Sequence, residues 1–133
     1  MAEPHDTALV RAQIEQLLSL TYAWTDFRQS HRFDEILDDT FEIVTPEGTM
    51  DRAEYVRRQT DREHAPYDTR HVWSNLQVSV DGDVAHVRFY QCAHIRQPRE
   101  RTAVAAMADV VDRWVRRPDG WRLASRVRTP SFG

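Results

Sequence analysis

The spacing of apolar residues changes once along the chain, at about Thr69, from intervals of three and four to alternation. Before that point the apolar and small side chains predict one long amphipathic helix over Thr7–Gln29. Its stripe consists of Val10, Ile14, Leu17, Leu18, Thr21, Tyr22 and Thr25. Helices followed by a run of antiparallel strands predict an α+β fold, in which a curved sheet wraps the long helix and leaves an apolar pocket at its open end.

Shorter elements connect the long helix to these strands. We expect a short helix over Phe33–Asp38 and a strand over Phe41–Val44, which a Thr-Pro-Glu-Gly turn joins to another short strand. Asp51, with Glu54 three residues later, has the form of a capping box. A further helix is therefore expected to begin at Asp51 and to end before Pro66.

Four strands are expected in the second half of the chain. The first alternates through Leu76, Val78 and Val80 and ends at an Asp-Gly turn, which is typical of a β-hairpin. A Pro-Asp-Gly turn precedes the last strand. The expected ranges are 69–80, 84–95, 102–116 and 121–128. No linker or repeat interrupts this pattern, so we expect a single domain over residues 1–133.

Composition narrows the chemistry that such a domain can perform. All 18 basic residues are Arg, which excludes lysine-dependent Schiff-base chemistry and a Walker lysine. The 4 glycines are too scattered for a phosphate-binding loop, and the single Cys92 cannot form an internal disulfide or a thiolate zinc cluster. Catalysis would depend on carboxylates, histidines, tyrosines and arginines, and we expect no cofactor.

Charge and hydropathy limit the partners. A net charge of −3 and a pI near 6.0 argue against a dedicated nucleic-acid binder. No apolar run approaches the ~18 residues that a membrane span needs. The segment Met1–Thr7 lacks the basic stretch and apolar core of a signal peptide, so a cytoplasmic location is expected.

Asp26 is the candidate catalytic carboxylate because it lies on the helix stripe that should face the core, four residues after Tyr22. A carboxylate there can orient a neighbouring imidazole and stabilise it when it takes up a proton, which makes the pair a general base. The simpler alternative is a solvated carboxylate at the helix end, or one paired with an arginine.

His71 is the candidate partner, since it opens the first long strand at the expected mouth of the pocket. Strict alternation with Leu76 and Val78 places it on the opposite face, unless a bulge intervenes near Ser74 and Asn75. Two histidines with one carboxylate also resemble the facial triad of non-haem iron enzymes, but the tight ligand spacing is absent, so no metal is expected.

Further candidates line the later strands. His86 and His94 share an expected strand face with Arg88 and Tyr90, as polar wall residues. Arg126 shares one with Arg122 and Arg128, which is typical of a solvated arginine row; alternatively, one arginine enters the pocket and stabilises a developing anion. Core or pocket walls that would suit a hydrophobic substrate are expected from the aromatic residues Tyr22, Trp24, Trp73, Tyr90 and Trp114.

Several segments carry a resemblance to a known family. They are Tyr22-Ala23-x-x-Asp26, Phe41-Glu42-Ile43-Val44-Thr45-Pro46-x-Gly48, Arg70-His71-x-x-x-Asn75 and the stretch from Asp112 to Arg122. With the element order, they make the chain resemble the SnoaL-like branch of the NTF2-like superfamily. The resemblance implies a cone-shaped fold and a homo-oligomer, a dimer or trimer, that packs the outer face of the sheet. Val110, Asp112 and Trp114 are expected to form part of that interface.

Two enzymes of this superfamily suggest roles for individual residues. The run Asp26-x-Arg28-Gln29-x-x-Arg32 is similar to the helix end of hexachlorocyclohexane dehydrochlorinase, which implies a catalytic dyad of Asp26 and His71 with Arg126 as the catalytic arginine. The lysine of that enzyme corresponds to Thr21. Scytalone dehydratase is similar through Tyr22-x-Trp24-x-Asp26 and through His71 and His94, which match its active-site histidines.

The resemblance implies a cofactor-independent lyase that eliminates water from a hydrophobic small molecule. His71, oriented by Asp26, would act as the base, and the leaving group or enolate would be assisted by Arg126, Tyr22 or His94. The same groups would serve an isomerase or an aldol-type cyclase. Two other classes stay open: a non-catalytic binding domain, and epoxide hydrolysis, for which Asp109 or Asp112 would join Asp26.

Overall fold

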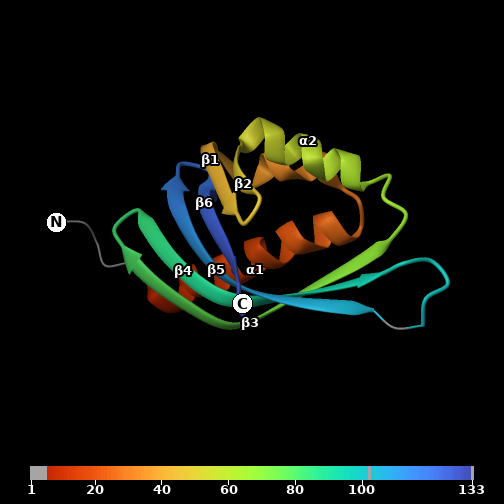
Figure 1. The fold of residues 1–133 in the computed structure, drawn as a ribbon. Coiled ribbons are helices and arrows are strands. Elements are labelled where there is room, and N and C mark those ends of the chain that lie inside the picture. The colour runs from red at the N-terminus through yellow and green to blue at the C-terminus, as the bar shows by residue number, and fades with distance from the viewer. Residues whose placement is uncertain (1–5, 102, 133) are drawn as a thin grey trace.

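The computed structural model describes residues 6–101 and 103–132. The long helix α1 (Thr7–Asp26) lies in the hollow of a curved sheet, and α2 (Arg52–Arg62) covers the end of the sheet beside β1 (Figure 1). The strands are β1 (Leu37–Thr45), β2 (Gly48–Asp51), β3 (Asp68–Asp81), β4 (Val84–Arg96), β5 (Val104–Arg117) and β6 (Gly120–Pro130), and a 3-10 helix, η1, spans Ser30–Glu35. The predicted α+β cone is confirmed.

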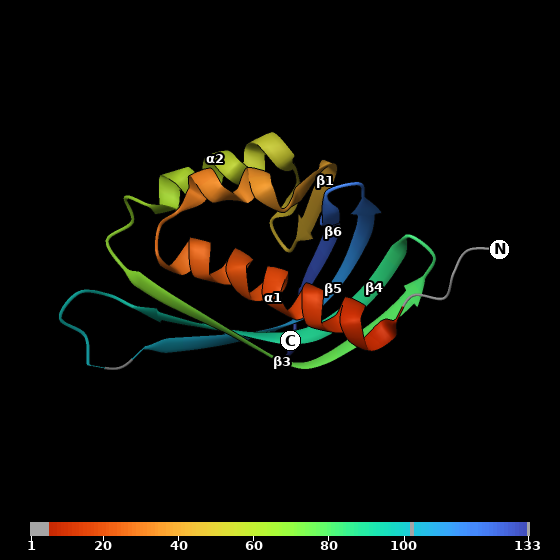
Figure 2. The same cartoon turned by 180° about the vertical axis from the view of Figure 1, so that it is seen from behind.

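The six strands form one sheet in the order β2-β1-β6-β5-β4-β3. Neighbouring strands are antiparallel except β1 and β6, which run parallel. Seen from behind, the hairpin of β4 and β5 extends past both helices, while β3 forms the edge beside α1 (Figure 2). Because β3 follows α2 directly and passes along α1, it can bring a polar side chain to the end of that helix.

Local residue chemistry sets the ends of α1. The Asp6 carboxylate accepts hydrogen bonds from the first-turn amides, that of Ala8 at 3.0 Å among them. Leu18 is fully buried on the stripe that packs against the sheet. The helix ends at Asp26, three residues before the predicted end at Gln29, because Arg28 takes a left-handed conformation with φ of 60°.

The connecting elements follow the prediction with shifted boundaries. The Asp51 carboxylate accepts from the amide of Glu54 at 2.9 Å, so the predicted cap of α2 is confirmed. The short helix, however, is η1 and ends at Glu35, and β1 already begins at Leu37. The early strand start places the buried Asp38 carboxylate 2.8 Å from Nε of Arg117 on the neighbouring hairpin.

A bulge in β3 decides the orientation of His71. The pairing of β3 with β4 shifts register between Ser74 and Gln77, and Asn75 has a φ of 57°. Asparagine tolerates this left-handed conformation better than most residues. The extra residue reverses the alternation, so that His71 and Leu76 both face α1. The sequence placed His71 on the inner face only if a bulge lay near Ser74 and Asn75, and that bulge is present.

A second register shift, in β6, decides the orientation of Arg126. Ala124 is the extra residue, because Leu123 pairs with Trp114 while Ser125 pairs with Arg113. Arg126 therefore faces the core, with 4% of its surface exposed, whereas Arg122, which precedes the bulge, points to the opposite face of the sheet. The prediction that these two arginines share one face is wrong, because the bulge interrupts the alternation.

The inner face of β5 also differs from the expectation. Val110, Asp112 and Trp114 are at most 1% exposed and face the core, so they cannot form an outer interface. The outer face of the sheet instead carries apolar side chains that are 39% to 54% exposed, namely Val72, Tyr90, Met107, Val111 and Val127.

Candidate active site

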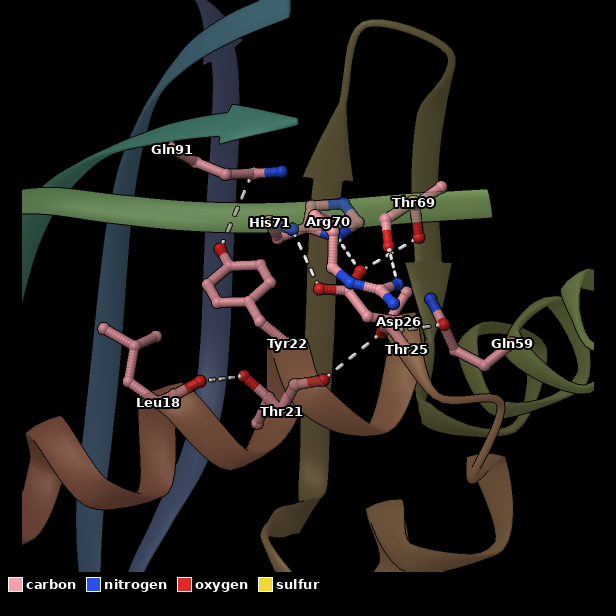
Figure 3. A network of polar contacts seen from close by, with 10 residues as sticks. All are labelled: Leu18, Thr21, Tyr22, Thr25, Asp26, Gln59, Thr69, Arg70, His71 and Gln91. Carbon is pink, nitrogen blue, oxygen red and sulfur yellow. Dashed lines mark hydrogen bonds and ion pairs between the residues drawn. The ribbon is translucent and has the colours of Figure 1, made fainter. Parts of the chain in front are cut away.

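The end of α1 meets the start of β3 in a buried hydrogen bond between Asp26 and His71. The Oδ1 atom of Asp26 lies 2.6 Å from Nδ1 of His71 (Figure 3). Each side chain is only 6% exposed. The two residues that the sequence suggested as a pair thus lie in contact, and the distance is typical of a bond to an ionised carboxylate.

Three donors from β3 hold the Asp26 carboxylate. Besides the imidazole, the backbone amide of His71 donates to Oδ2 at 2.8 Å, and the hydroxyl of Thr69 donates to Oδ1 at 2.9 Å (Figure 3). Burial alone would raise the pKa of Asp26, but the hydrogen bonds from His71 and Thr69 outweigh it and hold this pKa below its ordinary value. The carboxylate is therefore ionised at neutral pH.

His71 presents its other ring nitrogen as a free position. With Nδ1 directed at Asp26, the Nε2 atom has no hydrogen-bond partner among the described residues and is not sealed from solvent. The ring stacks on that of Tyr22, with centroids 5.3 Å apart and planes inclined by 16°. In the neutral tautomer with hydrogen on Nδ1, Nε2 is the acceptor, which is the state that a general base requires.

Tyr22 connects this pair to the centre of the sheet. Its hydroxyl lies 3.5 Å from Oε1 of the buried Gln91 (Figure 3), and the guanidinium carbon of Arg126 lies 5.2 Å from the centre of its ring. Burial raises the pKa of Tyr22 well above its usual range, more than the nearby Arg126 lowers it. The phenol therefore stays protonated and can donate a hydrogen bond.

Arg126 is paired with Asp112 rather than with the dyad. Its Nε and one terminal nitrogen donate to the two carboxylate oxygens at 2.7 and 2.8 Å. Burial would lower the pKa of Arg126, yet the charge of Asp112 raises it above its ordinary value, so the ion pair is permanent. Asp112 is thereby engaged, and Asp109 accepts from Ser131 at an exposed site, so neither carboxylate joins Asp26 as epoxide hydrolysis would need.

The remaining candidates lie elsewhere. Trp24 packs edge-on against Phe33 on another side of α1. Trp73 is partly buried beside α1 and donates from Nε1 to the Ser19 hydroxyl at 3.0 Å. The structure does not bring Tyr90, His86 or His94 to the dyad, because the alternation of β4 turns them to the outer face.

A small cavity borders Asp26, and His71 is not among the residues that line it. The cavity that borders Asp26 measures only about 10 Å³, which is the lower limit for one water molecule. Arg28 seals its rim by donating to the backbone oxygens of the segment after α2, those of Glu63 at 2.6 Å and Tyr67 at 3.0 Å among them. A larger hollow of about 570 Å³ lies apart from the dyad, between β1 and the start of α2.

Among residues 6–101 and 103–132, no three His, Cys, Asp or Glu side chains lie together in a way that could hold a metal ion. None of the helices in the same ranges is long and apolar enough to cross a membrane.

Sequence reasoning missed Thr69, Gln91 and Arg28. Thr69 had a detectable signal, because it lies two residues before His71 on the same strand and must share its face. No local pattern in the sequence indicates the roles of Gln91 and Arg28, because their contacts join segments more than 30 residues apart.

Comparisons with known proteins agree with this fold. A family model for the SnoaL-like domain matches residues 6–127. The crystal structure of Kfla4162 from Kribbella flavida has a TM-score of 0.85 at 21% identity, with 96% of this chain and 94% of that chain covered. Among the proteins with curated annotation, none matches this chain in sequence.

Two similar structures carry the names of enzymes. A putative scytalone dehydratase from Novosphingobium aromaticivorans has a TM-score of 0.83 at 21% identity, covering 96% of this chain and 88% of that one. A hexachlorocyclohexane dehydrochlorinase of type 2 has a TM-score of 0.79 at 20% identity, covering 94% and 87%. At such identities the likeness establishes the fold. The family match over residues 6–127 shows that the chain belongs to the SnoaL-like domain family.

Proposed function

We propose that this protein is a cofactor-independent lyase that eliminates water from a hydrophobic small molecule, with Asp26 and His71 as its general base. The observation that carries the proposal is the 2.6 Å bond from Oδ1 of Asp26 to Nδ1 of His71, which leaves Nε2 without a partner. The dehydratase and dehydrochlorinase among the similar structures support an elimination.

The proposed reaction removes a proton from a carbon next to a carbonyl group. His71 Nε2 takes that proton, and the electron pair of the C–H bond forms an enolate. The enolate then expels hydroxide from the neighbouring carbon, which creates the C=C bond. The imidazolium returns its proton to the departing hydroxide, so that water leaves and His71 is neutral again. Asp26 stabilises the imidazolium while it exists.

Tyr22 and Arg126 have supporting roles in this proposal. The protonated Tyr22 hydroxyl donates to the oxygen on which negative charge develops, because it is the neutral donor next to the imidazole. Arg126, whose charge Asp112 balances, acts on the substrate only through the Tyr22 ring above which it lies. The substrate approaches Nε2 from the side that is not sealed from solvent, because the cavity beside Asp26 is too small for a substrate and is not lined by His71.

A second candidate function is small-molecule binding without catalysis. The hollow of about 570 Å³ between β1 and the start of α2 favours it, because this hollow lies apart from Asp26 and His71. An isomerase or cyclase would use the same base and differ only in whether a leaving group departs.

Deuterium exchange separates catalysis from binding. In D₂O, hydroxy-carbonyl compounds of increasing apolar size are incubated with the protein, and exchange at the carbon next to the carbonyl is followed by NMR. Exchange reports proton abstraction whether elimination, isomerisation or cyclisation follows. We expect D26N to lower the rate by about 10²–10⁴-fold and H71Q by at least as much, with the fold intact.

Two control variants complete that experiment. D109N and H94Q remove an exposed carboxylate and an exposed imidazole from the outer face, and both should keep the wild-type rate. If ligands bind but neither wild type nor D26N catalyses deuterium exchange, the protein is a binding domain and the proposed lyase function is wrong.

We also propose a homo-oligomer, a dimer or trimer, that covers the exposed apolar outer face of the sheet. Apolar side chains that are exposed together on one face of a sheet are typical of an interaction surface. A hydrophobic substrate and a cytoplasmic location stay predictions.

A further inference from the structure

The Asp26 carboxylate has an unequal set of donors. Its Oδ1 atom accepts twice, from Nδ1 of His71 at 2.6 Å and from the hydroxyl of Thr69 at 2.9 Å, while Oδ2 accepts the backbone amide of His71 at 2.8 Å. Two of the three donors belong to His71 itself. The Thr69 hydroxyl is therefore the one donor that can be removed without altering either member of the dyad.

Thr69 is built into the strand that carries His71. It is 7% exposed and lies two residues before His71, so both side chains point from β3 toward the end of α1 (Figure 3). A β-branched side chain in a strand has restricted rotamers, which fixes the direction of its hydroxyl. The hydroxyl proton is committed to Asp26 in the structure.

We infer that Thr69 is a positioning residue of the proposed base, whose hydroxyl keeps the Asp26 carboxylate ionised and limits its pull on the imidazole proton. The inference rests on the proposed function, in which this pair takes up and returns a proton. A donor to an ionised carboxylate favours the ionised form, which agrees with the lowered pKa of Asp26. The same donor shares the charge of Oδ1, so the imidazolium is held less tightly and gives its proton back more readily.

Substituting Thr69 leaves the other charged and titratable groups around Asp26 and His71 in place. These groups come from each element that packs around the pair: Tyr22 on α1, Arg28 after α1, Arg62 at the end of α2, Tyr67 and Arg70 around the start of β3, and the pair of Asp112 on β5 and Arg126 on β6.

The test compares T69V, which loses the hydroxyl, with T69S, which keeps it. Thr45 supplies a matched control, because it is 8% exposed, lies in β1, and donates to the carboxylate of Glu47 at 2.9 Å. The titration of the Asp26 carboxyl carbon is followed by ¹³C NMR on the intact protein without substrate. In T69V we expect its inflection to rise by about half a pH unit or more, while T69S and T45V keep the wild-type value.

Kinetics give a second readout once a turned-over compound is known. With T69V we expect kcat to fall about 3- to 10-fold and KM to stay within about twofold. The acid limb of the pH–rate profile, where the rate falls because the base becomes protonated, should move to higher pH, because Asp26 then holds the imidazolium more tightly. A residue that only supports the fold would not move that limb. If T69V does not fold, T69A removes the same hydroxyl with less bulk.

The outcomes separate this inference from the proposed function. An unchanged Asp26 titration in T69V, or a shift in T69S as large as in T69V, overturns the role of Thr69 even if D26N abolishes proton abstraction. If T69V shifts the Asp26 titration but the wild-type protein abstracts no proton from any compound, Thr69 still controls the ionisation of Asp26. The proposed lyase function is then wrong.

Discussion

Within residues 6–101 and 103–132, two buried pairs join a carboxylate to a nitrogen-bearing side chain, and they differ in whether a hydrogen-bonding position stays free. Asp112 and Arg126 connect β5 to β6, with side chains 0% and 5% exposed, and both carboxylate oxygens are bound by one guanidinium. Asp26 and His71 connect α1 to β3, with side chains 6% exposed, and one ring nitrogen stays free. Burial is nearly the same in the two pairs.

The comparison teaches that a buried ion pair by itself does not indicate chemistry. Arginine keeps its proton at any physiological pH, so the pair of Asp112 and Arg126 can only hold the sheet together. Imidazole exchanges its proton near neutrality, and its two nitrogens separate the contact with Asp26 from a contact with a substrate. The free Nε2, rather than the burial, makes the second pair a candidate base.

The largest expected effect breaks the structural pair. R126M leaves Asp112 as an uncompensated buried charge, which should lower the free energy of unfolding by about 3–5 kcal/mol. H71F should cost about half as much, because Asp26 keeps two donors, the Thr69 hydroxyl and a backbone amide, whereas Asp112 in R126M keeps, within the described part of the chain, only the indole N–H of Trp114. Urea unfolding measures both. Equal losses would contradict the distinction between the pairs, and the double variant D112L/R126M should recover much of the stability as a control.

A middle-sized effect follows from the lowered pKa of Asp26. A carboxyl group whose folded pKa is depressed stabilises the fold above its unfolded pKa and loses that contribution as pH falls through the folded value. The free energy of unfolding by which wild type exceeds D26N should therefore shrink as the pH falls below the ordinary carboxyl pKa of about 4. Denaturant unfolding of both proteins at several pH values measures it; parallel curves would show that the dyad bonds do not stabilise the ionised form.

The smallest expected effect concerns access to the free nitrogen. R28Q removes the donors to the segment between α2 and β3 and should cost about 0.5–1.5 kcal/mol. Amide exchange over residues 63–68 should become faster, and so should modification of His71 by diethylpyrocarbonate. R11Q, which loses only an exposed pair with Glu15, is the control and should change neither rate. Unchanged modification in R28Q would mean that another segment controls entry.

Much of this fold follows from local patterns. The stripe through Leu18 predicts α1, the Asp51 side chain predicts the start of α2, and alternation predicts the strands, because helix caps and side-chain periodicity depend on neighbouring residues. The pairing of Asp26 with His71 could also be suggested, since a carboxylate on an apolar helix face is unusual.

The sequence by itself thus determined the elements, their order and two candidate side chains, because these depend on backbone geometry and desolvation within a few residues. The tertiary structure alone decided which way the candidates face. One extra residue at Asn75 turns His71 inward, and one at Ala124 turns Arg126 inward. Arg28 binds backbone oxygens of a segment that lies 35 residues later in the chain, beside the small cavity that borders Asp26. A bulge and a long-range hydrogen bond depend on how partner strands and helices pack, and that information is spread over the whole chain.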